Sequence, residues 1–106
     1  MMEIYLDTRE RYKKIVKWLD GQMVKDEIET SGDILAAIQT LLARNHLTIH
    51  QINHFVIHPG PGSFTGLRVG AAIANAFNFS KGLPVEEAIV PQYGEEPKIT
   101  KIKDQR

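Results

Sequence analysis

The chain has no cysteine and no excess of charge of either sign, and both absences limit what it can do. Without cysteine, disulfide bonds and thiol chemistry are excluded. Thirteen basic residues balance thirteen acidic ones, so no overall field draws the protein toward nucleic acid. No apolar run approaches the roughly 20 residues of a membrane span, and the N-terminus lacks the pattern of a signal peptide. We therefore expect a soluble, cytoplasmic protein that does not bind membranes.

The length of 106 residues, of which 42% are apolar, fits one domain with a single core. We expect one lobe over residues 1–90 and a polar tail over 91–106. The residue pairs Asp20-Gly21 and Lys81-Gly82 favour a hairpin turn and a helix end. Thr30 or Ser31 is expected to cap the first helix, with Asp33 in its first turn. The pattern predicts strands at 3–7, 12–19, 23–29, 52–58 and 84–89, and helices from about 33 to 45 and from 65 to 81.

The most informative stretch is a loop rich in glycine and proline between a predicted strand and a predicted helix. Residues 58–70 read His-Pro-Gly-Pro-Gly-Ser-Phe-Thr-Gly-Leu-Arg-Val-Gly. Its glycines allow close backbone approach, and Ser63 or Thr65 can cap the helix that follows. The spacing fits neither a dinucleotide fingerprint nor a P-loop. From the residues alone, a structural turn, a partner interface and a phosphate contact all stay open.

The predicted helices carry more apolar and small residues than one contact with a sheet requires. In the second helix, a stripe of small residues is expected to let another helix approach closely. A neighbouring stripe of larger residues is expected to face the sheet instead. The pattern favours a partner interface on the two helices, and the alternative is that they pack only on each other and on the sheet. The small stripe is Gly66, Gly70, Ala74 and Asn78, and the larger one is Val69, Ile73 and Phe77.

Catalytic interpretations of the sequence are weaker. The four histidines recur every four residues from His46 to His58, but they span a predicted turn and strand rather than one helix, which disfavours a metal site. Ser63 lacks a dedicated base and a nucleophile elbow. Asp7 and Thr8, at the end of the first strand, are candidates for nucleotide contact. A pairing of Asp7 with Arg9 is the simpler interpretation.

The loop also carries a family resemblance. Residues 59–70, and above all the run from Gly60 to Leu67, resemble the hallmark of the TsaB (YeaZ) family. The segment Ile4-Tyr5-Leu6-Asp7-Thr8 resembles the opening strand of that family, and the likeness extends from residue 3 to about 85. It implies a mixed α/β fold of the ribonuclease-H-like, actin-like type with the order β-β-β-α-β-α-β. Members usually continue into a second lobe, so the resemblance implies a short, single-lobe member.

The resemblance implies a partner subunit without catalysis of its own, which supports a TsaD-like enzyme in threonylcarbamoyladenosine modification of tRNA. It implies docking to that enzyme or to a second copy, contact with tRNA only through the complex, no cofactor or metal of its own, and ATP bound by the complex. The alternatives are a small metal- or nucleotide-dependent hydrolase and a homodimeric structural or regulatory protein unrelated to tRNA. The predicted interface is Leu35, Ile38, Leu42, Gly66, Arg68, Gly70, Ala74 and Phe77, and the motif loop is Gly60, Pro61, Gly62, Ser63, Phe64, Thr65 and Gly66.

Overall fold

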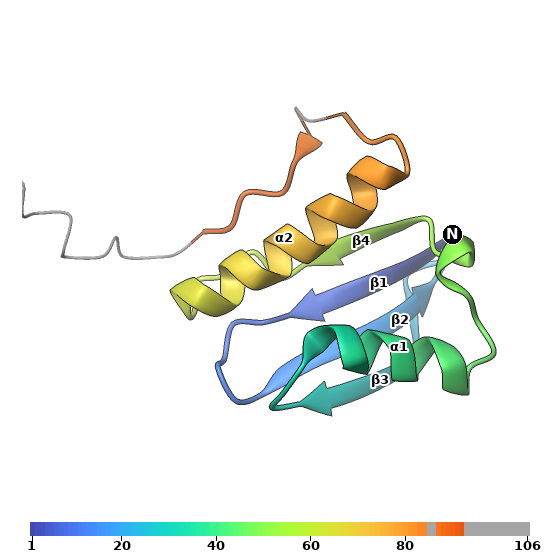
Figure 1. Cartoon of the computed structure of the whole chain (residues 1–106), viewed down its shortest axis with the longest axis horizontal. Helices are drawn as coiled ribbons and strands as arrows, with labels where there is room; N and C mark the ends of the chain where they lie inside the picture. The colour runs from blue at the N-terminus through green and yellow to red at the C-terminus, as the bar shows by residue number, and fades with distance from the viewer. Residues whose placement is uncertain (85–86, 93–106) are drawn as a thin grey trace, which may run out of the picture.

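A computed structural model describes residues 1–84 and 87–92 of the chain. Its centre is a four-stranded sheet with the order β3-β2-β1-β4 (Figure 1). The pairs β1–β2 and β2–β3 are antiparallel, whereas β4 lies parallel to β1. The strands are β1 (Met2–Asp7), β2 (Lys14–Asp20), β3 (Met23–Thr30) and β4 (His54–Ile57).

A hairpin joins β2 and β3, as the sequence predicts, but its turn begins one residue later than the Asp20-Gly21 signal indicates. Asp20 pairs with Met23 across the hairpin, so the turn itself consists of Gly21 and Gln22. Both have positive φ, 61° and 72°, which is the backbone that matches the twist of a tight hairpin. Glycine adopts it freely, whereas glutamine at such an angle is strained.

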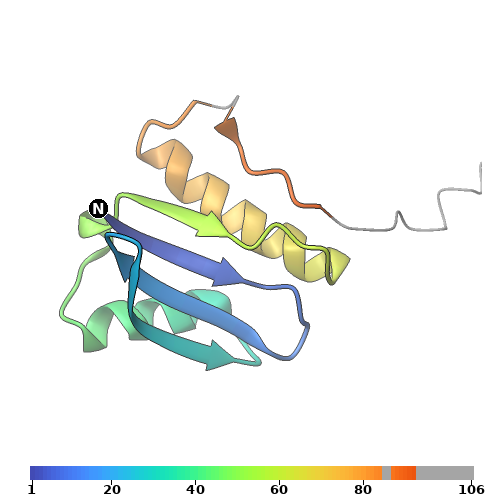
Figure 2. The ribbon, with the colours of Figure 1, turned by 180° about the vertical axis from the view of Figure 1, so that it is seen from behind.

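The helices α1 (Ile34–Arg44) and α2 (Phe64–Ser80) cover the same face of the sheet, and a short 3-10 turn, η1 (Ile49–Gln51), precedes β4. Figure 2 shows the opposite face of the sheet free of these helices. Helix α1 packs on β2 and β3, and α2 packs on β4. The arrangement is a two-layer α/β lobe, as predicted.

Caps define where the helices begin. Ser63 caps α2 by accepting a hydrogen bond from the Gly66 amide at 3.2 Å, as the sequence predicts. The prediction for α1 was wrong, because its cap is Asp33, which accepts from the Leu35 amide at 2.9 Å. The Thr30 hydroxyl instead accepts from the Gly32 amide at 3.0 Å, in the turn before the helix.

The core lies between the sheet and the two helices. Phe55 of β4 stacks on Phe77 of α2 with ring centroids 4.4 Å apart. Alternation along the strands places Ile4, Leu6 and Val16 in this layer. The buried apolar residues are Ile4, Leu6, Val16, Ile34, Ala37, Ile38, Leu41, Leu42, Ile52, Phe55, Ile57, Leu67, Ala71 and Ala74.

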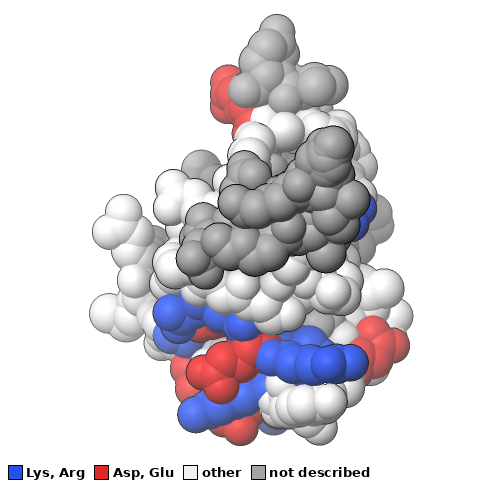
Figure 3. All heavy atoms as spheres, turned by 90° about the vertical axis from the view of Figure 1, so that its left-hand side faces the viewer, with Lys and Arg blue, Asp and Glu red and all other residues white. Residues whose placement is uncertain are grey.

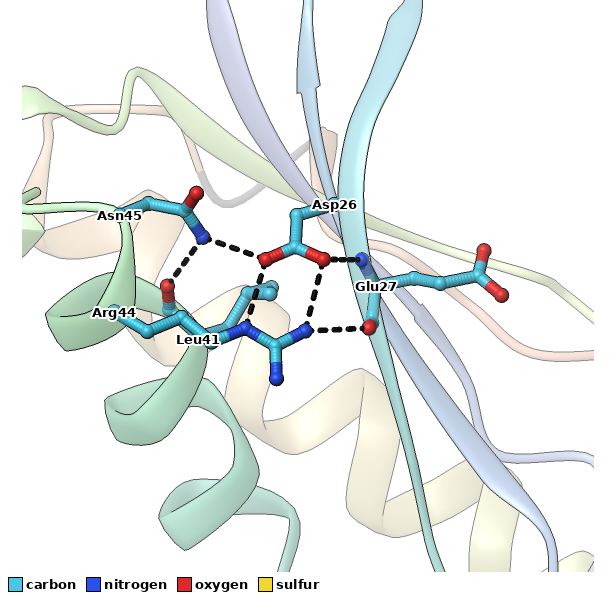
Figure 4. Close-up of polar contacts among 5 residues, drawn as sticks. All are labelled: Asp26, Glu27, Leu41, Arg44 and Asn45. Carbon is cyan, nitrogen blue, oxygen red and sulfur yellow. Dashed lines mark hydrogen bonds and ion pairs between the residues drawn. The ribbon is translucent and has the colours of Figure 1, made fainter.

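A polar network joins the end of α1 to β3 (Figure 4). Arg44 donates two hydrogen bonds to the Asp26 carboxylate, each at 2.8 Å, and a third to the Glu27 carbonyl at 2.9 Å. Asn45 adds a bond to the same carboxylate at 2.8 Å. Hydrogen bonds from Arg44, then from Asn45, hold the pKa of Asp26 well below its ordinary range.

The side chains of two asparagines of α2 form hydrogen bonds with backbone groups of neighbouring segments. The Asn78 side chain accepts from the Phe55 amide at 2.8 Å and donates to its carbonyl at 2.9 Å, so it occupies the outer edge of β4. Asn75 makes the equivalent pair of bonds to Ile89, at 2.8 and 3.0 Å. The Gln92 amide then donates to the Pro59 carbonyl at 2.6 Å. The chain after α2 is therefore bound to the glycine loop.

The last predicted strand, at 84–89, is only partly testable. Residues 85 and 86 lie outside the described part of the chain, and no strand is assigned at the described residues 87–92. Of the predicted tail, residues 91–106, the part from residue 93 onward also lies outside it. Within the described residues, no helix is both long and apolar enough to cross a membrane.

Candidate functional site

The glycine loop is held against the end of β1. The Ser63 amide donates to the Arg9 carbonyl at 2.8 Å. A side chain at Gly62 would clash with the Arg9 backbone, and one at Gly60, which has φ of 107°, would clash with Gln92. The loop glycines thus permit contacts inside the chain, which supports the structural interpretation of the loop.

The small-residue stripe of α2 faces the chain's own sheet, so the prediction that it faces a partner was wrong. A Cβ at Gly66 would overlap the Thr8 carbonyl oxygen, and one at Gly70 would lie 2.5 Å from the Thr8 Oγ1 atom. Ala74 is fully buried, and Asn78 is bonded to β4. The physical reason is that the missing side chains let α2 approach the end of β1, rather than a second helix.

The other predicted interface residues divide between core and surface. Ile38 and Leu42 of α1 belong to the core, which corrects their assignment to a partner. Phe77 packs on the same core through Phe55. Leu35 is 55% exposed, and Arg68 is exposed with its guanidinium 5.5 Å from the Phe64 ring centroid. Of the eight residues predicted to form the interface, therefore, only Leu35 and Arg68 lie clearly on the surface.

Sequence reasoning missed the outward side of α2. Val69 was expected to face the sheet, but it is 43% exposed. Thr65 and Ala72 share that side and are exposed as well. Small and apolar residues occur on nearly every side of α2, so their pattern alone could not indicate which side meets the sheet. The spacing of residues 65, 69 and 72, which places them on one side of a helix, was the signal in the sequence that could have indicated this outward side.

The outward sides of the two helices border a groove of about 630 Å³. It runs along the first half of α2, where Val69, Ala72 and Ile73 provide an apolar wall. Residues 32–35, at the start of α1, form the other wall. Thr8, Arg11 and Lys14 line the end where both helices begin, together with residues at the start of α2: Ser63, Thr65 and Gly66. An open apolar groove between helices suits a protruding helix or side chain of a partner.

At the end of β1, Asp7 and Arg9 form a two-point ion pair. The guanidinium donates to the two carboxylate oxygens at 2.9 and 2.8 Å. The hydrogen bond from Arg9 keeps the pKa of Asp7 below its ordinary value, and burial opposes this only in part. Thr8 is 1% exposed and lies under α2. The pairing of Asp7 with Arg9 is the simpler of the two interpretations that the sequence left open for Asp7, the other being nucleotide contact.

The four histidines occupy different surroundings. His46, with φ of 57°, follows α1, and His50 lies in η1. His54 of β4 lies 3.0 Å from the Glu3 carboxylate, and the His58 Nδ1 atom accepts from the Gly60 amide at 3.1 Å. Across the described ranges, no group of three or more histidine, aspartate or glutamate side chains is placed to hold a metal ion.

Comparison with known proteins identifies the lobe. The profile of the family described as "TsaD: tRNA N6-adenosine threonylcarbamoyltransferase" matches residues 29–87. The Haemophilus influenzae protein named tRNA threonylcarbamoyladenosine biosynthesis protein TsaB is 46% identical over 52 residues, which cover 49% of this chain and 22% of that protein. Its Escherichia coli counterpart is 30% identical over 89 residues, which cover 80% of this chain and 38% of that protein.

A solved structure agrees on the fold. YeaZ from Pseudomonas aeruginosa superposes with a TM-score of 0.66 at 19% identity, over 78% of this chain and 41% of that one. The lobe is thus of the ribonuclease-H-like, actin-like class. The chain belongs to the family of the matching profile, because that match spans more than half of its length, and proteins named TsaB are among its relatives. It spans less than half the length of these curated relatives, 22% of one and 38% of the other.

Proposed function

We propose that this chain is a partner subunit that docks onto a TsaD-like enzyme and supports it in the threonylcarbamoyladenosine modification of tRNA. The relatives called TsaB are named for the biosynthesis of that modification. The observation that carries the docking role is the groove between the outward sides of α1 and α2.

Burial of the exposed apolar residues of this surface against a partner would contribute to the free energy of binding. Leu35 and Val69 are 55% and 43% exposed, although both are large and apolar. Complete burial of such a side chain contributes roughly 1.5–3 kcal/mol, so the part still exposed would contribute about half of that. Ala72 beside them is small enough to let a partner helix approach. A helix of a TsaD-like enzyme is the occupant that this surface fits best.

The proposed role is conformational support rather than catalysis. Docking would stabilise the competent state of the enzyme by mass action, because the subunit binds that state preferentially. The polar groups at the end of β1 are already engaged, since Asp7 holds Arg9 and the Ser63 hydroxyl caps α2. We assign ATP and tRNA to the complex as a whole, because the chain's thirteen basic and thirteen acidic residues give it no net positive charge.

Size exclusion with light scattering tests the proposal on the chain alone and on a mixture with the TsaD homologue of the same organism. We expect a new species of one-to-one or two-to-two mass at micromolar concentration. Val69→Glu should abolish that species while far-UV circular dichroism stays unchanged. Ala43→Glu is the matched control, because Ala43 is exposed on α1 and does not line the groove.

Three results would contradict the proposal. If the wild-type chain mixed with the TsaD homologue gives no new species, the partner role is wrong, and the family likeness then reflects common ancestry only. A homodimer that ignores the TsaD homologue and is broken by Val69→Glu would assign the groove to a second copy. Loss of the complex in Val69→Glu and in Ala43→Glu alike would mean that the groove is not the docking surface.

A further inference from the structure

We infer that the groove binds a partner helix whose acidic end or carboxylate side chain lies at the end of the groove marked by Arg11 and Lys14. This inference rests on the proposed docking function and specifies the chemistry of the partner. The apolar part of the groove explains why a helix would bind there. The charged end determines in which direction it lies.

The first observation is that the cations of the groove are unpaired. Within the described part of the chain, neither Arg11 nor Lys14 forms an ion pair. Arg11 lies 5.5 Å from the Tyr12 ring centroid, and Lys14 makes a long hydrogen bond of 3.4 Å to the Gly32 carbonyl. Arg9 and Arg44, by contrast, each bind an aspartate of the same chain at 2.8 Å. Arg11 and Lys14 are therefore cations at the groove that no carboxylate of the described residues neutralises.

The second observation is the absence of a compensating carboxylate in the groove itself. The lining contains one acidic residue, Asp33. Its Oδ1 atom accepts the Leu35 amide at 2.9 Å, so this carboxylate is committed to capping α1. Neither helix has an acidic residue in its first turn. Two cations against one engaged carboxylate leave this end of the groove positive.

The third observation is that both helices begin at this end. The N-terminus of a helix carries a partial positive charge, and α1 and α2 place theirs on opposite walls of one groove. Thr8 lies in the lining between them, and its buried hydroxyl has no hydrogen-bond partner among the described residues. Figure 3 views the molecule from this side and shows lysine and arginine side chains gathered around acidic ones.

These features favour a carboxylate of a protein over a small free anion. The wall formed by Val69, Ala72 and Ile73 continues directly from the charged end, so one ligand with an apolar body and an anionic end fills the whole groove. Inorganic phosphate would leave the apolar part exposed to water. A helix with apolar residues along one side and an acidic residue at one end satisfies both parts.

Charge reversal tests the inference on the complex of the full chain with the TsaD homologue. The variants are Arg11→Glu and Lys14→Glu, with Lys25→Glu as the matched control, because Lys25 is exposed on β3 outside the groove. Affinity and its salt dependence are measured by titration calorimetry or biolayer interferometry between 50 and 300 mM NaCl. Circular dichroism verifies that each variant is folded.

We expect each groove reversal to weaken binding by roughly five- to tenfold at low salt and to flatten the salt dependence. Lys25→Glu should change the affinity by less than about twofold. A lysine substituted for the acidic residue on the docking helix of the enzyme should restore binding to Lys14→Glu.

The possible results separate the two proposals. If the wild-type chain binds and both groove reversals behave like Lys25→Glu, the partner role stands and this inference is wrong. If inorganic phosphate binds the isolated chain, and Arg11→Glu and Lys14→Glu abolish that binding without changing affinity for the enzyme, the charged end is a small-anion site and the inference is also wrong. If the wild-type chain does not bind the enzyme at all, both fail.

Discussion

Thr8 and Gly70 lie in direct contact where α2 crosses the end of β1: a Cβ added at Gly70 would be 2.5 Å from the Thr8 Oγ1 atom and 3.2 Å from its Cγ2 atom. Thr8 is branched at Cβ, so rotation about χ1 exchanges one clashing atom for another. The contact fixes the distance between helix and strand. It also explains why a residue without a side chain stands at position 70.

Gly70→Ala should therefore destabilise the chain rather than disturb a partner interface. We expect a loss of about 1–3 kcal/mol in the free energy of unfolding, from overpacking, measured by urea denaturation. Thr8→Ala removes both clashing atoms, so the double variant Thr8→Ala/Gly70→Ala should recover much of that loss. Ala72→Ser, on the outward side of α2, is the control and should change stability by less than about 0.5 kcal/mol. Equal stability of Gly70→Ala and wild type would refute the close contact.

Asn78 should be the most sensitive polar residue of the chain. It is 2% exposed and satisfies the amide and the carbonyl of Phe55. Asn78→Leu conserves the shape but leaves both backbone groups unpaired, and an unsatisfied buried group costs about 1–3 kcal/mol. We expect a loss of about 2–4 kcal/mol from the two groups together.

Hydrogen exchange provides the specific measurement for Asn78. The Phe55 amide should be protected in the wild-type chain and exchange much faster in Asn78→Leu. The freed edge of β4 should also promote association that depends on concentration, because an unpaired edge strand accepts another strand. Unchanged protection of the Phe55 amide would show that Asn78 does not hold the edge of β4.

The contact between Asp26 and Arg44 should make stability depend on pH. Since the pKa of Asp26 is lower in the folded chain than its ordinary value of 3.8, its carboxylate stabilises the fold above that pH. This stabilisation is lost progressively as the pH falls below about 4. Arg44 remains charged throughout, so the loss comes from protonation of Asp26.

Urea midpoints of the wild-type chain and of Asp26→Asn between pH 7 and pH 2 test this prediction. The wild-type midpoint should be higher at pH 7, and the difference should shrink toward pH 2. Asp7→Asn is needed as a second comparison, because the pKa of Asp7 is also lowered, chiefly by its hydrogen bond with Arg9. A constant difference between wild type and Asp26→Asn would contradict the prediction.

Gln22 offers a stabilising substitution. It occupies the second turn position of the β2–β3 hairpin with φ of 72°, and a glutamine at that angle costs about 1 kcal/mol. Gln22→Gly should raise the free energy of unfolding by roughly 0.5–1 kcal/mol. Thermal unfolding compares it with Gly21→Ala, which introduces a side chain at the other positive angle and should lower stability. If Gln22→Gly lowers the stability instead, the proposed strain at Gln22 in this turn is wrong.

Much of the fold could be predicted from local sequence. The Asp20-Gly21 signal and the Ser63 cap each act over a few residues, and both mark elements that the structure contains, the β2–β3 hairpin and the start of α2. The cap of α1 was misplaced, because Thr30, Ser31 and Asp33 can each accept a helix amide. Which of them does so depends on how the turn after β3 closes.

The sequence by itself determined the order of the elements, the glycine loop and the family, because these depend on residue identity and short spacing. Only the tertiary structure decided which side of α2 is outward. Gly66 and Gly70 are compatible with close approach to any neighbour, and the neighbour proved to be Thr8 of the same chain. That choice buries the small residues and leaves Val69 exposed beside the groove. The groove that we propose as a docking surface follows from long-range packing, which no local pattern contains.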